Sequence, residues 1–230
     1  MSAEVVSDTE EQLKKLVPLF PECQVSFRIL NQKQVQGRVT SDAYHIAVYT
    51  ECSIKNYTNA GFMLQQMDLW LSAKGLGSWW HGLISPSAPQ KEADGLPFAF
   101  ILTFGIAAEN VHRLNAAEFQ RKELGQIANV TGMDKLLEAV RLAPSSMNGQ
   151  PWYFTGCESS LRLYKAKACG NPILKKMLKN IQYLDGGIAL CHLWLAASVE
   201  GFMISFEQEN AVPTLSESYE YICTANLRKH

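Results

Sequence analysis

Two long stretches of apolar residues at helical spacing dominate the pattern of the chain. In residues 58–74, apolar side chains recur every three or four positions from Ala60 to Leu71, and Gly75 follows where a helix would end. Residues 185–200 show a second pattern of this kind, again followed by a glycine. Both patterns predict long and largely buried helices.

Shorter patterns predict strands and two short helices. Residues 24–30 alternate between apolar and polar positions, which is typical of a half-buried strand, and residues 98–104 form a continuous apolar run that suits a central strand. Further strands are expected at 44–49, 152–154, 161–164 and 219–224, short helices at 10–17 and 134–142, which Pro18 and Pro144 end, and a loop at 85–95. Because helices and strands mix without a regular βαβ series, the expected fold class is α+β.

The two long helices align with each other when the sequence is shifted by 126 positions. The shift pairs Gly61 with Gly187, and it also places the first short helix on the second. Two separate elements that share one shift indicate an internal duplication. We therefore expect a single domain, residues 1–230, made of two pseudo-repeats (about 9–125 and 126–230) that imitates a two-fold dimer, with its ligand site on the pseudo-axis.

Composition removes several classes of function. With 21 Lys+Arg against 22 Asp+Glu, the formal net charge is -1, which gives no bulk attraction to nucleic acid or anionic lipid. No apolar run reaches the ~20 residues of a membrane span, and residues 1–15 are acidic and polar, unlike a secretory signal. The six cysteines lack close pairs, so reduced thiols and a cytoplasmic location are expected.

Candidate chemistry gathers in residues 143–152, Ala-Pro-Ser-Ser-Met-Asn-Gly-Gln-Pro-Trp, between a predicted helix and a predicted strand. Its hydroxyl and amide side chains both donate and accept hydrogen bonds, as a planar heterocycle requires. On residue chemistry alone, a polar turn that satisfies its own backbone is the simpler interpretation. The shift of 126 positions places Leu19 and Glu22 opposite Ser145 and Asn148, so a site here would be intact in the second half alone.

Other segments give weaker signals. Residues 75–82, Gly-Leu-Gly-Ser-Trp-Trp-His-Gly, follow a helix instead of opening one, which argues against a dinucleotide-binding glycine loop. A glycine cap with Trp79 and Trp80 in the core is the simpler interpretation. Arg121 and Lys122 could hold a phosphate, although an exposed basic pair is usually just solvated. The histidine in the second long helix is interpreted as a satisfied core residue, and G-x-S-x-G, H-E-x-x-H and metal-ligand spacings are missing.

Together, these segments resemble the FMN-dependent nitroreductase family. The string at 143–152 matches that family's flavin-contacting motif closely, and 75–82 is similar to its glycine-rich loop after the central helix. The Phe-Gly pair at 104–105 with the basic pair at 121–122 resembles its late strand and phosphate-binding stretch. The order of the motifs is similar to the compact single-chain TM nitroreductase branch. The resemblance covers most of the chain and implies a nitroreductase-like α+β sandwich.

The resemblance also implies how a cofactor is held. It places FMN in a crevice between the two halves, with one group of contacts from each half and a basic pair at the phosphate. These contacts are Ser145, Ser146, Asn148 and Gln150 from the second half, Gly75, Leu76, Gly77 and Ser78 from the first, and Arg121 with Lys122 at the phosphate. The family opens with R-x-S-x-R, whereas residues 1–9 contain no arginine. Because the phosphate then has fewer charged partners, weak FMN binding is expected.

The implied function is an FMN-dependent NAD(P)H oxidoreductase that reduces nitroaromatics, quinones or similar small acceptors in a ping-pong cycle. No side chain is assigned as a catalytic acid or base, and no metal, nucleic-acid or membrane partner is expected. The alternative is a non-catalytic protein of the same fold that binds flavin weakly or binds another planar ligand. A serine hydrolase using Ser145 ranks far below both, because the sequence pairs that serine with no base. A monomer would suffice, and a homodimer stays open.

Overall fold

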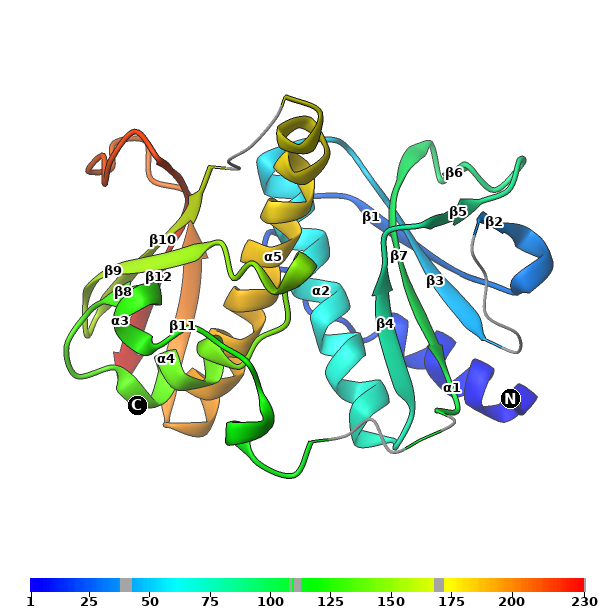
Figure 1. Cartoon of the computed structure of the whole chain (residues 1–230), viewed down its shortest axis with the longest axis horizontal. Helices are drawn as coiled ribbons and strands as arrows, with labels where there is room; N and C mark the ends of the chain where they lie inside the picture. Colours follow the sequence, from blue (N-terminus) through cyan, green and yellow to red (C-terminus); the bar gives the residue numbers. More distant parts are fainter. Residues whose placement is uncertain (38–42, 108, 110–112, 168–171, 230) are drawn as a thin grey trace.

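Two long helices lie side by side at the centre of the molecule. The computed structural model describes residues 1–37, 43–107, 109, 113–167 and 172–229, with the backbone alone for 172–177 and 179. The helices are α2 (Ile54–Ala73) and α5 (Pro172–Val199), and Figure 1 shows them between two β-sheets. Buried apolar side chains from each helix pack against its neighbouring sheet, so two main cores flank the helix pair.

Local signals set both ends of α2. At its start, the Ser53 hydroxyl accepts the N–H of Asn56 at 3.1 Å and so caps the first turn. At its end, Gly75 adopts a φ of 74°, a left-handed conformation that favours glycine. The N–H of Leu76 then donates to the carbonyl of Leu71 at 3.0 Å, which closes the last turn. The predicted glycine stop is confirmed.

Glycines bring the backbones of α2 and α5 into contact. A Cβ atom at Gly187 would lie 2.6 Å from the amide nitrogen of Phe62 and would also overlap the carbonyl oxygen of Thr58. A Cβ atom at Gly61 would lie 2.9 Å from the Cα and carbonyl carbon of Leu184. No flexible side chain could yield at either place, so both positions require glycine.

Each long helix has its own antiparallel sheet with the same order of strands. The first sheet runs β1 (Val25–Leu30), β3 (Tyr44–Thr50), β7 (Leu96–Gly105) and β4 (Gly77–His81). The second runs β9 (Trp152–Cys157), β10 (Ser160–Ala166), β12 (Tyr219–Lys229) and β11 (Phe202–Glu207), with β8 (Ala128–Asn129) added in parallel beside β9. In both sheets, the first strand after the long helix lies at an edge.

Smaller elements complete the layers. They are the helices α1 (Ala3–Leu13), α3 (Leu124–Ile127) and α4 (Asp134–Arg141), the 3-10 turns η1 (Gln32–Gln34), η2 (Ala116–Glu118) and η3 (Ser146–Asn148), and the short strands β2 (Val35–Gly37), β5 (Ile84–Pro86) and β6 (Glu92–Ala93). Side chains from β2, β5 and β6 form a third apolar cluster with the first sheet. Figure 1 shows β2, β5 and β6 beside the β1–β3–β7 strands.

Most of the predicted elements are confirmed, and the α+β class with them. The helix expected at 10–17 is wrong, because α1 spans Ala3–Leu13 with the Ser2 side chain as its N-cap. The loop expected at 85–95 contains parts of β5 and all of β6. The strands β4 and β11 were not predicted, because neither Gly-Ser-Trp-Trp-His at 77–81 nor Phe-Met-Ile-Ser-Phe-Glu at 202–207 alternates regularly between apolar and polar residues.

The findings on membrane-spanning helices, metal sites and cysteines apply to the described residues only. Within them, no helix has the length and apolarity that crossing a membrane requires. Among the same residues, no three histidine, cysteine or acidic side chains lie together as a metal site would need. Five cysteines are free thiols, and the sixth, Cys169, lies outside the described residues.

Candidate functional site

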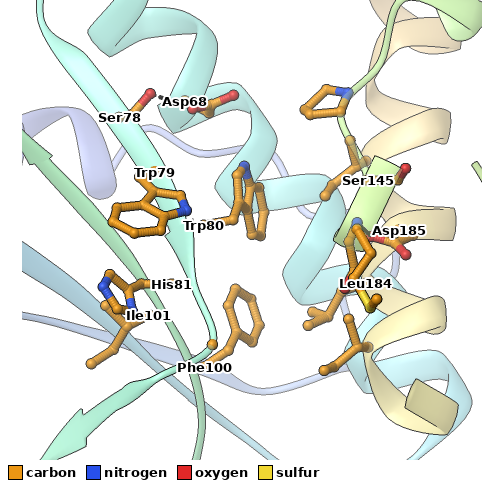
Figure 2. Close-up of a pocket in the computed structure, with 16 residues that line it drawn as sticks. Asp68, Ser78, Trp79, Trp80, His81, Phe100, Ile101, Ser145, Leu184 and Asp185 are labelled. Atoms are coloured by element: carbon orange, nitrogen blue, oxygen red, sulfur yellow. Dashed lines mark hydrogen bonds between the residues drawn. The ribbon is translucent and has the colours of Figure 1, made fainter. Parts of the chain in front are cut away.

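A cavity of about 410 Å³ lies where β4 of the first sheet faces α5 and the segment before β9. Its lining residues are Asp68, Ser78, Trp79, Trp80, His81, Gly82, Phe100, Ile101, Pro144, Ser145, Ser146, Met147, Ile181, Leu184, Asp185 and Ile188. Figure 2 shows Trp80 and Phe100 on one side and Ser145 and Leu184 on the other. Such a volume holds a small organic molecule. The cavity therefore joins the two halves of the chain.

The free edge of β4 forms one side of the cavity. Successive residues of a strand point to opposite faces, yet all of residues 78–82 line the cavity. Because β4 is the last strand of its sheet, a cavity at its unpaired edge touches both faces. A ligand there meets main-chain groups as well as side chains.

The segment opposite β4 has an unusual backbone. Met147, Asn148 and Gln150 have φ values of 52°, 53° and 44°, a region that few residues other than glycine adopt. Each such residue costs of order 1–3 kcal/mol and persists only where its surroundings hold it in place. Met147 is also 78% exposed at the rim of the cavity. Strain concentrated beside a cavity is typical of a functional segment.

Buried hydrogen bonds hold this backbone in place. Gln150 is 3% exposed, and its side chain accepts the N–H of Lys122 at 2.8 Å and donates to the carbonyl of Asn148 at 3.1 Å. The Ser145 hydroxyl accepts the N–H of Gln150 at 2.9 Å. The lining of the cavity includes Ser145 and Ser146 but neither Asn148 nor Gln150. Of these four predicted residues, two thus line the cavity and two brace the segment.

The predicted basic pair lies against the same segment. Arg121 donates to Oδ1 of Asn148 at 2.9 Å and to the carbonyl of Leu142 at 3.2 Å, and Lys122 donates to the carbonyl of Gly149 at 2.9 Å. Neither cation forms an ion pair with a carboxylate in the part of the chain that the structure describes. Burial lowers the pKa of both groups. Two half-buried positive charges without a counterion are therefore available to an anion.

The glycine-rich stretch contributes less than the sequence indicates. Gly75 ends α2, and Leu76 is buried in the core of the first half. Gly77 begins β4, where an added Cβ would meet that of Ala107 at 3.2 Å. Of the four predicted residues, only Ser78 lines the cavity. The structure therefore brings Ser78 together with the serines of the second half and places Gly75, Leu76 and Gly77 outside the lining.

The two tryptophans are not the core pair that the sequence favours. Trp79 is 57% exposed and contacts the ring of His81 in a tilted arrangement, with ring centroids 4.4 Å apart. Trp80 points to the other face of β4 and stacks on Phe100 at 5.6 Å. Both tryptophans line the cavity. The expectation is wrong for Trp79, because neighbouring strand residues lie on opposite faces and cannot both enter one core.

Two aspartates in the cavity wall were missed. Asp68, on α2, accepts the Ser78 hydroxyl at one oxygen and the Gln65 amide at the other, the latter at 3.0 Å. Asp185, on α5, accepts the N–H of Ser146 at 2.9 Å. Burial raises the pKa of both carboxyls, that of Asp185 to about 7. The one signal in the sequence is a carboxylate within an otherwise apolar helical pattern.

The histidine of the second long helix is a satisfied core residue, as expected. Nδ1 of His192 lies 3.0 Å from the carbonyl of Ala139, and Nε2 lies 3.2 Å from the Gln65 amide nitrogen. These partners assign the proton to Nδ1. Burial lowers the pKa of His192 to about 4, so the ring is neutral near pH 7.

Comparisons with known proteins identify the fold and the family of the chain. Over 99% of its length, the chain matches the crystal structure of a "putative nitroreductase" from Thermotoga maritima, at a TM-score of 0.64 and 19% sequence identity, covering 84% of that chain. This likeness shows a nitroreductase-like fold. A family model described as "Putative TM nitroreductase" matches residues 1–197, and the chain belongs to that family. No functionally curated protein matches the sequence.

Proposed function

We propose that the protein is an FMN-dependent NAD(P)H oxidoreductase that reduces nitroaromatics, quinones or similar small acceptors. The observation that carries the proposal is the cavity between β4 and residues 144–147, next to the strained backbone of residues 147–150. Arg121 and Lys122 lie against the same segment and form no ion pair with any described residue. Membership of a nitroreductase family supports oxidoreductase chemistry. A cytoplasmic location accompanies the proposal; a monomer would suffice for it, and a homodimer stays open.

We infer further that the single domain, residues 1–230, is an internal duplication with halves at about 9–125 and 126–230. The contact of Gly61 with Leu184 corresponds to that of Gly187 with Thr58 under the shift of 126 positions. Likewise, Asn59 accepts the N–H of Phe20 at 3.0 Å, as Asp185 does from Ser146 at 2.9 Å.

Reciprocal contacts of this kind are what a two-fold axis between the helices produces. The order of strands, which is the same in both sheets, supports the same inference. The two-fold relation also implies a second position equivalent to the cavity.

That equivalent position is filled with aromatic side chains. The shift places Leu19 and Phe20 opposite the cavity serines, and both are buried in the core. Phe62 packs there on Trp194 and Phe206, with ring centroids 5.4 and 5.8 Å apart. The chain therefore keeps one open site out of an ancestral pair, in line with the loss of polar residues at Leu19 and Glu22.

The residues around the cavity fit a flavin. Apolar and aromatic walls, such as Trp80 and Leu184, suit the faces of a planar ring, and hydroxyl groups suit its polar edge. The proposed ring contacts in the cavity are Ser78, Ser145 and Ser146, and the proposed phosphate contacts are Arg121 and Lys122. Gly75, Leu76, Gly77, Asn148 and Gln150 lie outside the lining of the cavity and stay predictions from the family resemblance. Bound FMN would accept hydride from NAD(P)H and pass electrons to the acceptor. The chain would orient the ring, exclude water from its faces and balance the phosphate charge.

Flavin fluorescence tests the proposal directly. Purified protein titrated with FMN should quench the flavin emission, and the mixture should oxidise NAD(P)H when a nitroaromatic is added. The first half of the chain suggests an inactive variant, in which Ser145→Leu and Ser146→Phe introduce the residues found at the corresponding positions Leu19 and Phe20. This double variant should keep its circular dichroism spectrum and lose FMN quenching. Wild-type protein that neither quenches FMN nor oxidises NAD(P)H would refute the proposal.

One observation favours the alternative of a non-catalytic protein that binds flavin weakly or another planar ligand. The donors of Arg121 already contact Asn148 and the carbonyls of Gln120 and Leu142, so an incoming phosphate competes with existing bonds. If the alternative holds, a planar ligand without a phosphate binds as well as FMN does, and NAD(P)H is not oxidised.

A further inference from the structure

The cavity contains two carboxyl groups that the proposed flavin contacts do not use. Asp68 comes from α2 and Asp185 from α5, and neither forms an ion pair with any described residue. The lining includes no lysine or arginine. Burial lowers the pKa of His81, so this ring is neutral near pH 7. Any charge in the lining is therefore negative.

Asp185 has a carboxylate oxygen with no hydrogen-bond partner among the described residues. Its Oδ1 accepts the N–H of Ser146, while the residue as a whole is only 3% exposed. In the first half, the neutral amide of Asn59 makes the corresponding bond to Phe20. Anchoring the loop therefore does not require a charge. A buried carboxylate is unfavourable unless a cation or further donors approach its free oxygen.

Aromatic faces surround the same space. Trp80 and Phe100 stack with an interplanar angle of 18°, and Trp79 lies at the rim. The face of an aromatic ring attracts a cation within about 6 Å of its centre, and indole does so best. Carboxylates and indole faces in one cavity favour the same kind of ligand, a flat ring that carries positive charge.

We propose that this cavity binds planar aromatic cations. This inference does not rest on the proposed function. Asp68 and Asp185 supply opposite charge from two helices, and Trp79 and Trp80 supply the faces for stacking. A neutral ring of the same shape loses the charge attraction and leaves the carboxyl groups without a counterion.

A pair of matched probes tests the proposal. Benzamidinium and benzamide have nearly the same shape and differ in charge, and their binding to the full chain is measured by NMR titration at about pH 8, above the raised pKa of Asp185. Wild-type protein should bind benzamidinium at least about tenfold more tightly than benzamide. Asp68→Asn and Asp185→Asn should each reduce this ratio at least about threefold. Asp8→Asn, on the exposed side of α1, is the matched control and should leave the ratio unchanged.

Equal affinities for the two probes in the wild type would overturn the proposal without any variant. A preference that survives both Asp68→Asn and Asp185→Asn would place the cation elsewhere and overturn it as well. Asp185→Asn is expected to fold, because Asn59 makes the same bond in the first half. The FMN titration is a separate measurement. A chain that prefers benzamidinium but does not quench FMN keeps this inference and loses the flavin function, and the opposite result refutes the cation site alone.

Discussion

The contact between the two central helices makes Gly187→Ala a severe test of the proposed packing. The new Cβ would lie 2.6 Å from the amide nitrogen of Phe62, where ordinary contacts begin at 3.4 Å. The shortfall of about 0.8 Å falls on backbone atoms, which do not rotate away as a side-chain end would. The helices must therefore move apart along a seam that also carries both cores.

The magnitude follows from two opposing effects. Alanine has an intrinsic advantage of about 1 kcal/mol over glycine inside a helix, while overpacking a rigid core costs about 1–3 kcal/mol and sometimes more. Because the clash here meets main chain on the partner helix, we expect Gly187→Ala to lower the free energy of unfolding by about 3 kcal/mol. That is a large part of the roughly 5–15 kcal/mol available to a domain.

Urea unfolding followed by circular dichroism measures this change, and the neighbouring glycine supplies the control. A Cβ at Gly186 would meet the flexible ends of two side chains, Cδ1 of Ile222 at 2.6 Å and Cδ2 of Leu163 at 3.7 Å, and no backbone atom. Gly186→Ala should therefore be neutral or slightly stabilising. Gly61→Ala should resemble Gly187→Ala, and the double variant should cost less than the sum, because helices already separated accommodate the second methyl. Equal stability of Gly187→Ala and Gly186→Ala would refute the close packing of α2 on α5.

Three further predictions concern the site and its filled counterpart. The folded-state pKa of Asp185, about 7, exceeds its ordinary value of 3.8, so the folded state is favoured when this carboxyl group is protonated. The free energy of unfolding of wild type, relative to that of Asp185→Asn, should therefore fall as pH rises between these two values. A difference in unfolding free energy that does not change with pH in urea titrations would contradict the burial of Asp185. Arg121→Ala should weaken FMN binding about tenfold or more while changing riboflavin binding little, with exposed Arg228→Ala as the control; equal losses for both flavins would remove Arg121 from the phosphate. Phe62→Ala should lower the free energy of unfolding by about 3–5 kcal/mol in urea titrations, because it empties the aromatic cluster; a loss below about 1 kcal/mol would show that this position is not packed.

Much of the fold follows from local pattern. The strands near 24–30, 44–49 and 98–104 alternate or run apolar strongly enough to be read directly, and the glycine after α2 ends the helix as expected. The error at residues 10–17 arose because a proline was taken as the end of a helix, whereas the Ser2 cap fixes its start and the helix finishes before Pro18. Local signals predict that a helix or strand is interrupted near a given residue better than they predict the length of each element.

The residues of the candidate site likewise fall into those that the sequence predicts and those that it misses. Ser145 and Ser146 are predicted and line the cavity, and so does Ser78, because a motif of several residues identifies its own segment. Asp68 and Asp185 gave almost no signal, because each is a single polar residue in an apolar helix. Whether such a residue faces solvent or a cavity depends on what packs against the helix from far along the chain.

From the amino-acid sequence alone came the order of the elements, the spacing of 126 positions between the two long helices and the polar segment before β9, since each depends on neighbouring residues or on a constant spacing along the chain. Tertiary structure alone decided that the edge of β4 faces this segment and that Trp79 is exposed while Phe62, Trp194 and Phe206 pack together. The reason is that a cavity is the space between elements distant in sequence, and its shape depends on which side chains from both halves meet there.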